Sequence, residues 1–291
     1  MPPRPIRYDL ALGCMLPTSL TALPALPAGH GSLAFSRSDG RTILQTCRAA
    51  SPLKLITPRN HGHGAWVVAA TFGGGLVDGD GIHLDVDLAA GTTALLGTQA
   101  STKVYRCPSS ACSQHLDARV ADGALLAVVP DPVACFAEAR YQQVNRVALA
   151  ATASLILVDA FTSGRAARGE RWDFHRYASR TSIDRAGAPL LLDSIILDPA
   201  HGNLRARLGR FDAFATVVLA GPRALPLIEA ARVLPAPGRR ASIVQSASPI
   251  GEDCLVLRIA GASVEEVART VRGHLAGLAA LLGDDPFARK W

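Results

Sequence analysis

The sequence lacks the short motifs that mark the common classes of intracellular enzyme. It has no G-x-x-x-x-G-K-[ST] loop, so we expect no nucleotide hydrolysis by this chain alone. It also has no G-x-S-x-G nucleophile elbow and no H-E-x-x-H metal-binding helix. A G-x-G-x-x-G turn between a strand and a helix is missing as well. These absences favour a binding protein over an enzyme.

Aromatic residues, long apolar runs and patterned cysteines are also scarce. Aromatics make up 5% of the chain, and no apolar stretch reaches the roughly 18 residues that a membrane-spanning helix needs. The start of the sequence has no apolar segment ending in a cleavage site, so we expect a cytoplasmic protein. The cysteines form neither a C-x-x-C pair nor a disulfide framework, and free thiols are predicted. They are Cys14, Cys47, Cys107, Cys112, Cys135 and Cys254.

The positive charge is not concentrated anywhere in the sequence. The net charge is +6, and no run of five like charges occurs. Nucleic-acid binding needs a basic patch or stripe, so we expect no nucleic-acid partner. A diffuse basic surface can still dock an acidic protein.

What the sequence does contain is alternation typical of β-strands, after a proline-rich segment at residues 1–30 that is predicted to be irregular. Hydrophobic residues account for 49% of the chain, enough for a large core. Between Ile82 and Leu88 every second residue is apolar, which indicates a strand with one buried face. The segment 65–71 is a second predicted strand, and residues 60–64 are a predicted loop.

A strand-turn-strand pattern occurs three times in succession. The turns centre on Gly91, Gly123 and Thr152, at separations of 32 and 29 residues. A period of this length predicts stacked β units, each burying its face on its neighbour. Stacking would bring together at one edge the polar segments that follow each unit, residues 99–106, 131–132 and 159–170.

The C-terminal part of the sequence changes to helical spacing. Residues 222–233 show helical apolar spacing, and 243–259 return to a strand pattern. Ser263 and Glu266 form a capping-box pair before a helix predicted at 263–282, which Gly283 can end. We predict a mainly β fold of stacked, solenoid-like antiparallel or mixed sheets, with two or so α-helices towards the C-terminus. One domain spans 31–283, and 284–291 form a tail.

Three groups of residues are candidate metal ligands. Imidazoles suit nickel, copper and zinc, so His61 and His63 are one candidate pair, although a plain polar loop is the favoured explanation. Thiolate ligands are offered by Cys107 and Cys112, with His115 nearby, at irregular spacing. The third group is acidic and lies near predicted strand ends, where carboxylates can line a cation channel or simply pair with arginines. It comprises Asp131, Asp159 and Glu170.

Two loops have unusual composition. The first is Gly-rich, from Gly73 to Asp80, and either lets another backbone approach closely or is a tight turn into the next strand. The second, 163–172, combines two glycines, three arginines and a tryptophan, which suits a shaped loop used for recognition.

Three ordered blocks resemble the urease accessory protein D family, also called UreD or UreH. They are GGGLVDGDGIHLDVDL from Gly73, TQASTKVYR from Thr98 and GRAARGERWDF from Gly164. PLKLITPR from Pro52 and VVPDPVACF from Val128 are similar to further blocks of the family. The resemblance covers roughly residues 30–280. Asp78 departs from it, standing where the family usually has glycine, and Gly81 stands where a polar residue is common.

The resemblance implies a non-enzymatic scaffold. Family members form a complex with a helical UreF partner and a nickel-binding GTPase, UreG, and dock on apo-urease. A possible dimeric assembly through the partner follows. No tightly bound cofactor is expected, although nickel in transit is possible. Asp131 and Glu170 are predicted carboxylates along a nickel route. The matching motif and docking positions are Gly73, Gly74, Gly75, Asp80, Gln99, Lys103, Tyr105, Arg106, Gly164, Arg165 and Gly169.

Two other functions are compatible with the residues. A stand-alone metalloenzyme would use His61, His63 and a carboxylate, and would hold stoichiometric metal by itself. A basic β-rich protein that binds polyanions would show affinity that falls steeply with salt.

Overall fold

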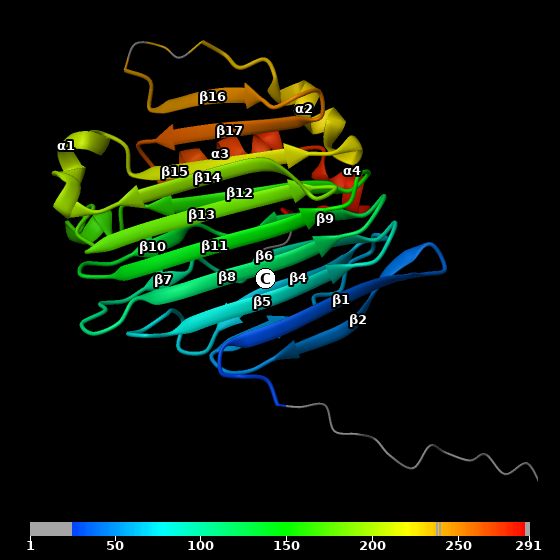
Figure 1. The fold of residues 1–291 in the computed structure, drawn as a ribbon. Helices are drawn as coiled ribbons and strands as arrows, with labels where there is room; N and C mark the ends of the chain where they lie inside the picture. The colour runs from blue at the N-terminus through cyan, green and yellow to red at the C-terminus, as the bar shows by residue number, and fades with distance from the viewer. Residues whose placement is uncertain (1–24, 237, 239, 289–291) are drawn as a thin grey trace, which may run out of the picture.

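The computed structural model describes residues 25–236, 238 and 240–288, and most of the proline-rich segment predicted as irregular lies outside this range. The described residues form two stacked β-sheets with four short α-helices (Figure 1). The seven-stranded sheet has the order β14 (Ala188–Leu197), β13 (Arg176–Arg185), β11 (Arg140–Leu149), β8 (Cys112–Val120), β5 (Gly81–Leu88), β1 (His30–Ser38) and β2 (Arg41–Ala49). The predicted mainly β, stacked architecture is confirmed.

The second sheet has ten strands. Its main path runs β16 (Ile243–Pro249), β17 (Cys254–Gly261), β15 (Ala213–Ala220), β12 (Ser154–Thr162), β9 (Leu125–Val129), β6 (Thr93–Thr98), β4 (Ala65–Thr71) and β3 (Leu53–Ile56). Two short strands, β7 (Lys103–Val104) and β10 (Val133–Cys135), pair beside β12 at one end.

The three repeated strand-turn-strand units stack as the sequence predicts. The first strands of the units, β5, β8 and β11, pair in parallel in the seven-stranded sheet. The second strands, β6, β9 and β12, pair in parallel in the ten-stranded sheet. The turns also stack, because the Gly91 N–H donates to the Asp122 carbonyl at 2.9 Å and the Gly123 N–H donates to Thr152 Oγ1 at 3.0 Å. Each unit therefore adds one strand to each layer.

Two hydrophobic layers result from this arrangement. The first fills the space between the sheets, and the second lies between the ten-stranded sheet and the C-terminal helices. Every residue of β12 is buried, because both faces of this strand are covered. Leu157 points to the first layer and Ile156 to the second, as alternation along a strand requires.

The helices lie at the C-terminal half of the chain, as α1 (Leu204–Leu208), α2 (Leu225–Ala231), α3 (Val264–His274) and α4 (Leu278–Leu282). The prediction of a single helix over 263–282 is wrong. This segment forms two helices, because the helical backbone is interrupted at Leu275, whose φ and ψ are −100° and 16°. Ser263 caps α3 by accepting the Glu266 N–H at 3.2 Å, and Gly283 ends α4 in the left-handed conformation. Three 3-10 turns occupy Ala166–Arg168, Pro199–His201 and Pro222–Ala224.

The segment after α4 lies against the body as far as the structure describes it. The Asp284 carboxylate accepts the His61 N–H at 2.9 Å, and Phe287 packs on the second hydrophobic layer. None of the helices among the described residues is long and apolar enough to cross a membrane.

Candidate functional site

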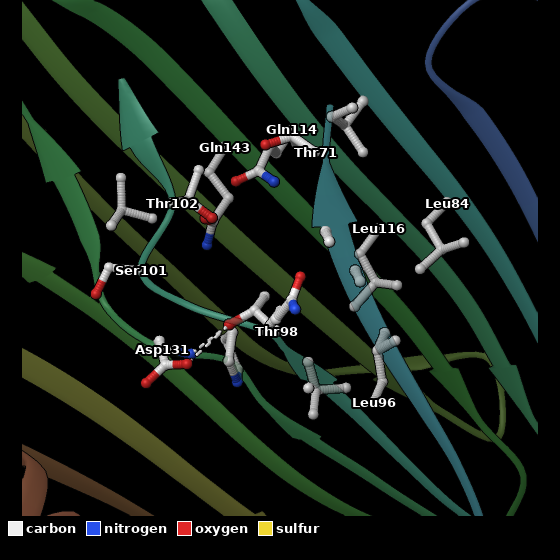
Figure 2. Close-up of a pocket in the computed structure, with 18 of the residues that line it drawn as sticks. Thr71, Leu84, Leu96, Thr98, Ser101, Thr102, Gln114, Leu116, Asp131 and Gln143 are labelled. Carbon is white, nitrogen blue, oxygen red and sulfur yellow. Dashed lines mark hydrogen bonds between the residues drawn. The ribbon is translucent and has the colours of Figure 1, made fainter. Parts of the chain in front are cut away.

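A cavity of about 190 Å³ lies between the two sheets, where the three repeated units end. Side chains from both sheets line it, and apolar Leu84, Leu96 and Leu116 form one side (Figure 2). The polar side is made by Thr98 and, from the segments that the repeat predicts will meet at one edge, by Gln99, Asp131 and Asp159. The prediction that these polar positions gather is therefore confirmed for this part of the edge.

Asp131 lines both this cavity and a second one. A cavity of about 110 Å³ lies on the other side of the ten-stranded sheet, against Val267 and Val271 of α3. Thr98, Gln99 and Asp131 line both cavities. The Asp131 N–H donates to Thr98 Oγ1 at 2.7 Å, which fixes the end of one repeat unit against the next (Figure 2). The wall that the two cavities share, here called the junction, thus includes an aspartate.

Asp159 is the buried carboxylate of the site. It projects from β12 into the inter-sheet space, where Ser179 of the facing sheet donates a hydrogen bond to Oδ2. Its other oxygen, Oδ1, is buried and makes no hydrogen bond with a described residue. Burial raises the pKa of Asp159, and the Ser179 hydrogen bond opposes that shift. The site therefore favours a neutral carboxyl group and holds an oxygen with spare acceptor capacity.

Polar side chains that the sequence reasoning missed surround Asp159. They come from inward positions of β8, β11 and β13, in register with one another. The Tyr141 hydroxyl lies 2.9 Å from Gln143 Oε1, and Asn145 Nδ2 donates to Thr181 Oγ1 at 3.1 Å. On each of these strands, polar residues stand at inward-facing positions that are otherwise apolar. This signal can be recognised only once it is known which alternate positions of the strand face inward.

The three blocks of the sequence resemblance meet at the same end of the molecule. Gly75 packs on β7, where a Cβ would lie 2.6 Å from the Tyr105 ring and 2.7 Å from the Lys103 carbonyl. The Tyr105 ring meets the Phe136 ring edge-on, with the ring centroids 5.2 Å apart. The Arg165 guanidinium lies over the Phe136 ring, 4.2 Å from its centroid. The glycine loop thus allows close approach by a neighbouring strand of its own chain.

This end surface, the motif surface, is partly apolar. Phe72, Val77 and Tyr105 are exposed on it, at 58, 54 and 37% of their area. Arg106 and Glu138 add an exposed ion pair at 3.7 Å. Exposed aromatic and arginine side chains on shaped loops suit protein recognition.

Asp78, which stands where the family usually has glycine, causes no backbone strain. Gly79 takes the left-handed conformation, with φ of 81°, and Asp78 does not. The Asp78 carboxylate accepts the N–H groups of Ser109 and Ser110 at 3.0 and 2.8 Å. These hydrogen bonds hold the pKa of Asp78 below its usual value. Asp80 Oδ2 closes the same turn by accepting the Val77 N–H at 2.9 Å.

Glu170 lies outside the lining of both cavities. Its Oε2 accepts from Arg165 Nε at 2.8 Å and from the Ala137 N–H at 3.2 Å. The hydrogen bond from Arg165 is the main reason that the pKa of Glu170 is lowered, and the Ala137 N–H adds to it. Gly164 and Gly169 give this loop its shape through left-handed backbone. The structure therefore separates Asp131 from Glu170.

Among the described residues, the other candidate ligands do not gather into groups of three that could hold a metal. Cys107 Sγ and Cys112 Sγ lie 3.5 Å apart and are buried, but His115 points to the opposite face of β8. Within the part of the chain that the structure describes, His61 and His63 gather no third ligand residue. The free cysteines are confirmed for Cys47, Cys107, Cys112, Cys135 and Cys254.

The fold and the site together define a two-sheet β protein with an internal cavity that has one polar side, and with a partly apolar surface at one end. Comparison with known proteins specifies the family. The family model described as "UreD urease accessory protein" matches residues 28–291. A urease accessory protein UreD from Sorangium cellulosum is 57% identical over 265 residues, covering 91% of this chain and 85% of that protein.

Similarity extends across bacteria and plants. A urease accessory protein UreD from an Anaeromyxobacter species is 44% identical, covering 99% of this chain and 98% of the relative. A urease accessory protein D from Oryza sativa subsp. indica is 35% identical, covering 91% and 97%. The chain belongs to the UreD urease accessory protein family, which supports a role in urease maturation.

Proposed function

We propose that this chain is a non-catalytic scaffold that joins apo-urease to a UreF-like partner and a UreG-like nickel-binding GTPase, and that nickel reaches urease through it. The observation that carries the proposal is the pair of cavities that share Thr98, Gln99 and Asp131 as walls. They place polar groups on both sides of the ten-stranded sheet, where a partly hydrated cation can pass between oxygen ligands.

Asp131 and Asp159 have different roles in this route. Asp131 stands at the junction and offers a carboxylate to a borderline cation. Asp159 lies deeper and offers the oxygen Oδ1, which makes no hydrogen bond with a described residue. A passing cation would favour the charged form of Asp159, which burial disfavours in its absence. The route is therefore expected to bind nickel transiently and to hold no resident cofactor.

The motif surface is the proposed docking site for the protein partners. Its exposed Phe72, Val77 and Tyr105 supply apolar area, and Arg106 and Lys103 supply positive charge. The Arg165–Glu170 pair fixes the adjoining loop, so the surface is preformed. We also propose a cytoplasmic location, which suits the free thiols because that compartment keeps thiols reduced.

Co-expression with urease subunits and the partner accessory proteins tests the route. Asp131→Asn removes the negative charge at the junction while keeping the size of the side chain. We therefore expect urease activity and urease-bound nickel to fall together. Asp87→Asn is the matched control, since Asp87 is exposed on the far face of the seven-stranded sheet and pairs with Arg119. Full activation by the Asp131 variant would contradict the route.

The nickel role of Glu170 stays a prediction, which a paired comparison can test. If Glu170 acts by holding Arg165, then Glu170→Gln and Arg165→Gln should reduce activation to the same extent, because each breaks the same pair. If Glu170 contacts nickel, only its own variant should lower nickel transfer while partner capture stays intact. Co-purification of the partners measures capture separately from activation.

A further inference from the structure

The outer face of the seven-stranded sheet carries a row of imidazoles beside a row of carboxylates. Parallel pairing of β1, β5 and β8 places His30 opposite His83 and His83 opposite His115. The rings stack at 5.0 and 5.7 Å with interplanar angles of 8 and 11°. Two residues along, the same register places Asp85 opposite Asp117. This face points away from the inter-sheet cavity.

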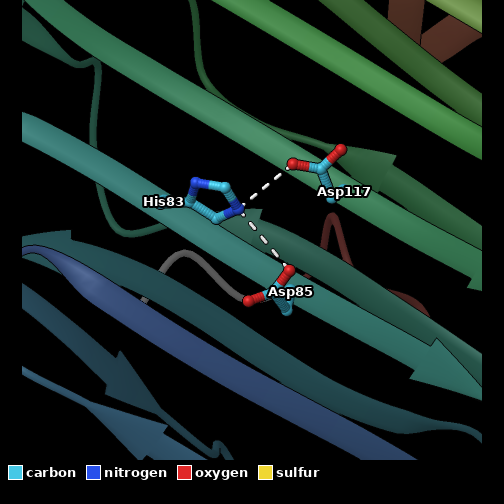
Figure 3. A group of neighbouring side chains, drawn as sticks. All are labelled: His83, Asp85 and Asp117. Atoms are coloured by element: carbon cyan, nitrogen blue, oxygen red, sulfur yellow. Dashed lines mark ion pairs between the residues drawn. The ribbon is translucent and has the colours of Figure 1, made fainter. Parts of the chain in front are cut away.

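Three ligand atoms converge at the edge between the two rows. His83 Nε2 lies 3.1 Å from Asp117 Oδ2 and 3.5 Å from Asp85 Oδ1 (Figure 3). One ligand atom from each of the three residues lies within 4.8 Å of the others. Bonds of about 2.1 Å to a tetrahedral or octahedral metal leave neighbouring ligands about 3.0–3.4 Å apart, so the two distances from His83 Nε2 to the carboxylates need little adjustment.

We propose that His83, Asp85 and Asp117 bind a borderline divalent cation of the Ni²⁺ or Zn²⁺ kind on this face. One imidazole and two carboxylates suit such ions, and three protein ligands leave positions for water. Exposure of the side chains, between 28 and 48%, lets the ion enter from solvent. This site is separate from the proposed nickel route and does not rest on it.

The neighbouring residues favour the site in one way and compete with it in another. His30 and His115 stack on the two faces of His83 and hold its ring. Arg146 competes, because its Nη1 lies 3.3 Å from Asp117 Oδ1. Its side chain is 57% exposed and can move aside when a cation binds.

Calorimetric titration of the full chain with Ni²⁺ at neutral pH tests the site, with Co²⁺ absorption as a second, spectroscopic readout. We expect stoichiometric binding that weakens at least about tenfold in His83→Ala and in the double variant Asp85→Asn/Asp117→Asn. Asp87→Asn, on the same strand and face, should bind as the unmodified chain does. Arg146→Gln should bind more tightly, because it removes the competing guanidinium. Circular dichroism checks that each variant is folded.

Unchanged Ni²⁺ affinity in the double aspartate variant would overturn the proposal. So would Ni²⁺ binding that survives in His83→Ala but is lost in Asp131→Asn, since the ion would then lie at the cavity junction. Urease activation in the co-expression assay is a separate readout, and its failure would bear on the proposed scaffold function alone.

Discussion

Asp159 shows how one residue can be poorly placed for stability yet suited to a route for cations. It lies between two sheets, with one oxygen bonded to Ser179 and the other without a described hydrogen-bond partner. A buried acceptor without a partner costs about 1–3 kcal/mol. A carboxylate is unexpected in a structural core, and the proposed cation route would give it a function.

The pH dependence of Asp159 can be predicted with its sign. An unfolded aspartate titrates near about 3.9, and burial raises the folded-state pKa above that value. Between the two values the folded chain binds more protons than the unfolded chain, so the contribution of Asp159 to stability falls as pH rises through this window. Asp159→Asn should therefore be more stable than the unmodified chain at neutral pH, by about 1–3 kcal/mol.

Urea unfolding at neutral and acidic pH measures this effect. The stability advantage of the Asp159→Asn variant should shrink as the pH is lowered towards the unfolded-state pKa. Asp159 is then neutral in the folded chain, as the substituted asparagine is at every pH. Asp87→Asn, an exposed carboxylate, serves as the control. Equal or lower stability of the Asp159 variant at neutral pH would show that the carboxylate is stabilised in the folded chain.

At the scale of elements, loops decide the shape of the motif surface. The loop between β12 and β13 folds around Gly164, Arg165 and Glu170, and packs against the end of β10. Gly164 has φ of 109°, and a Cβ there would lie 2.7 Å from the Cys135 carbonyl. Gly169 also has positive φ, 80°, but nothing lies within 4 Å of its Cβ position. The two glycines are needed for different reasons.

Alanine substitution should separate these reasons. Gly169→Ala meets only the left-handed backbone penalty of about 1 kcal/mol. Gly164→Ala meets a backbone penalty and a clash with a strand end, so we expect a loss of about 3 kcal/mol. Thermal or urea unfolding compares the two variants directly. Equal losses would mean that the Cys135 carbonyl moves aside without cost.

At the scale of the whole molecule, the ten-stranded sheet joins two hydrophobic layers. Trp66 lies in the layer beneath the helices, and Trp172 lies in the layer between the sheets. Both layers include residues of β12, on opposite faces of the strand. Loss of either layer exposes one side of the same strands, so we expect the layers to unfold together.

Single-tryptophan variants test this cooperativity. Trp66→Phe with Trp291→Phe leaves Trp172 as the reporter, and Trp172→Phe with Trp291→Phe leaves Trp66. We expect each reporter to give a urea midpoint that coincides with that from circular dichroism of the same variant. A separate, earlier transition for Trp66 would instead divide the predicted domain of residues 31–283 into two units.

The sequence by itself determined the β architecture, because period-two alternation and the 29–32 residue repeat are local properties that each unit carries. It also predicted part of the polar edge, the meeting of residues 99, 131 and 159, since stacked units place equivalent positions side by side. The sequence did not predict the helix break at Leu275, because Ser263 and Gly283 mark only the start of the first helix and the end of the second.

Only the tertiary structure decided which side chains share a site. Register between strands aligned His83 with His115 and Asp85 with Asp117, although more than 30 residues separate the members of each pair. Strand parity turned His115 away from Cys112. Glu170 pairs with Arg165 and does not line the cavity that Asp131 lines. Each outcome depends on pairing between distant segments, and the pairing is set by the energy of the assembled sheets.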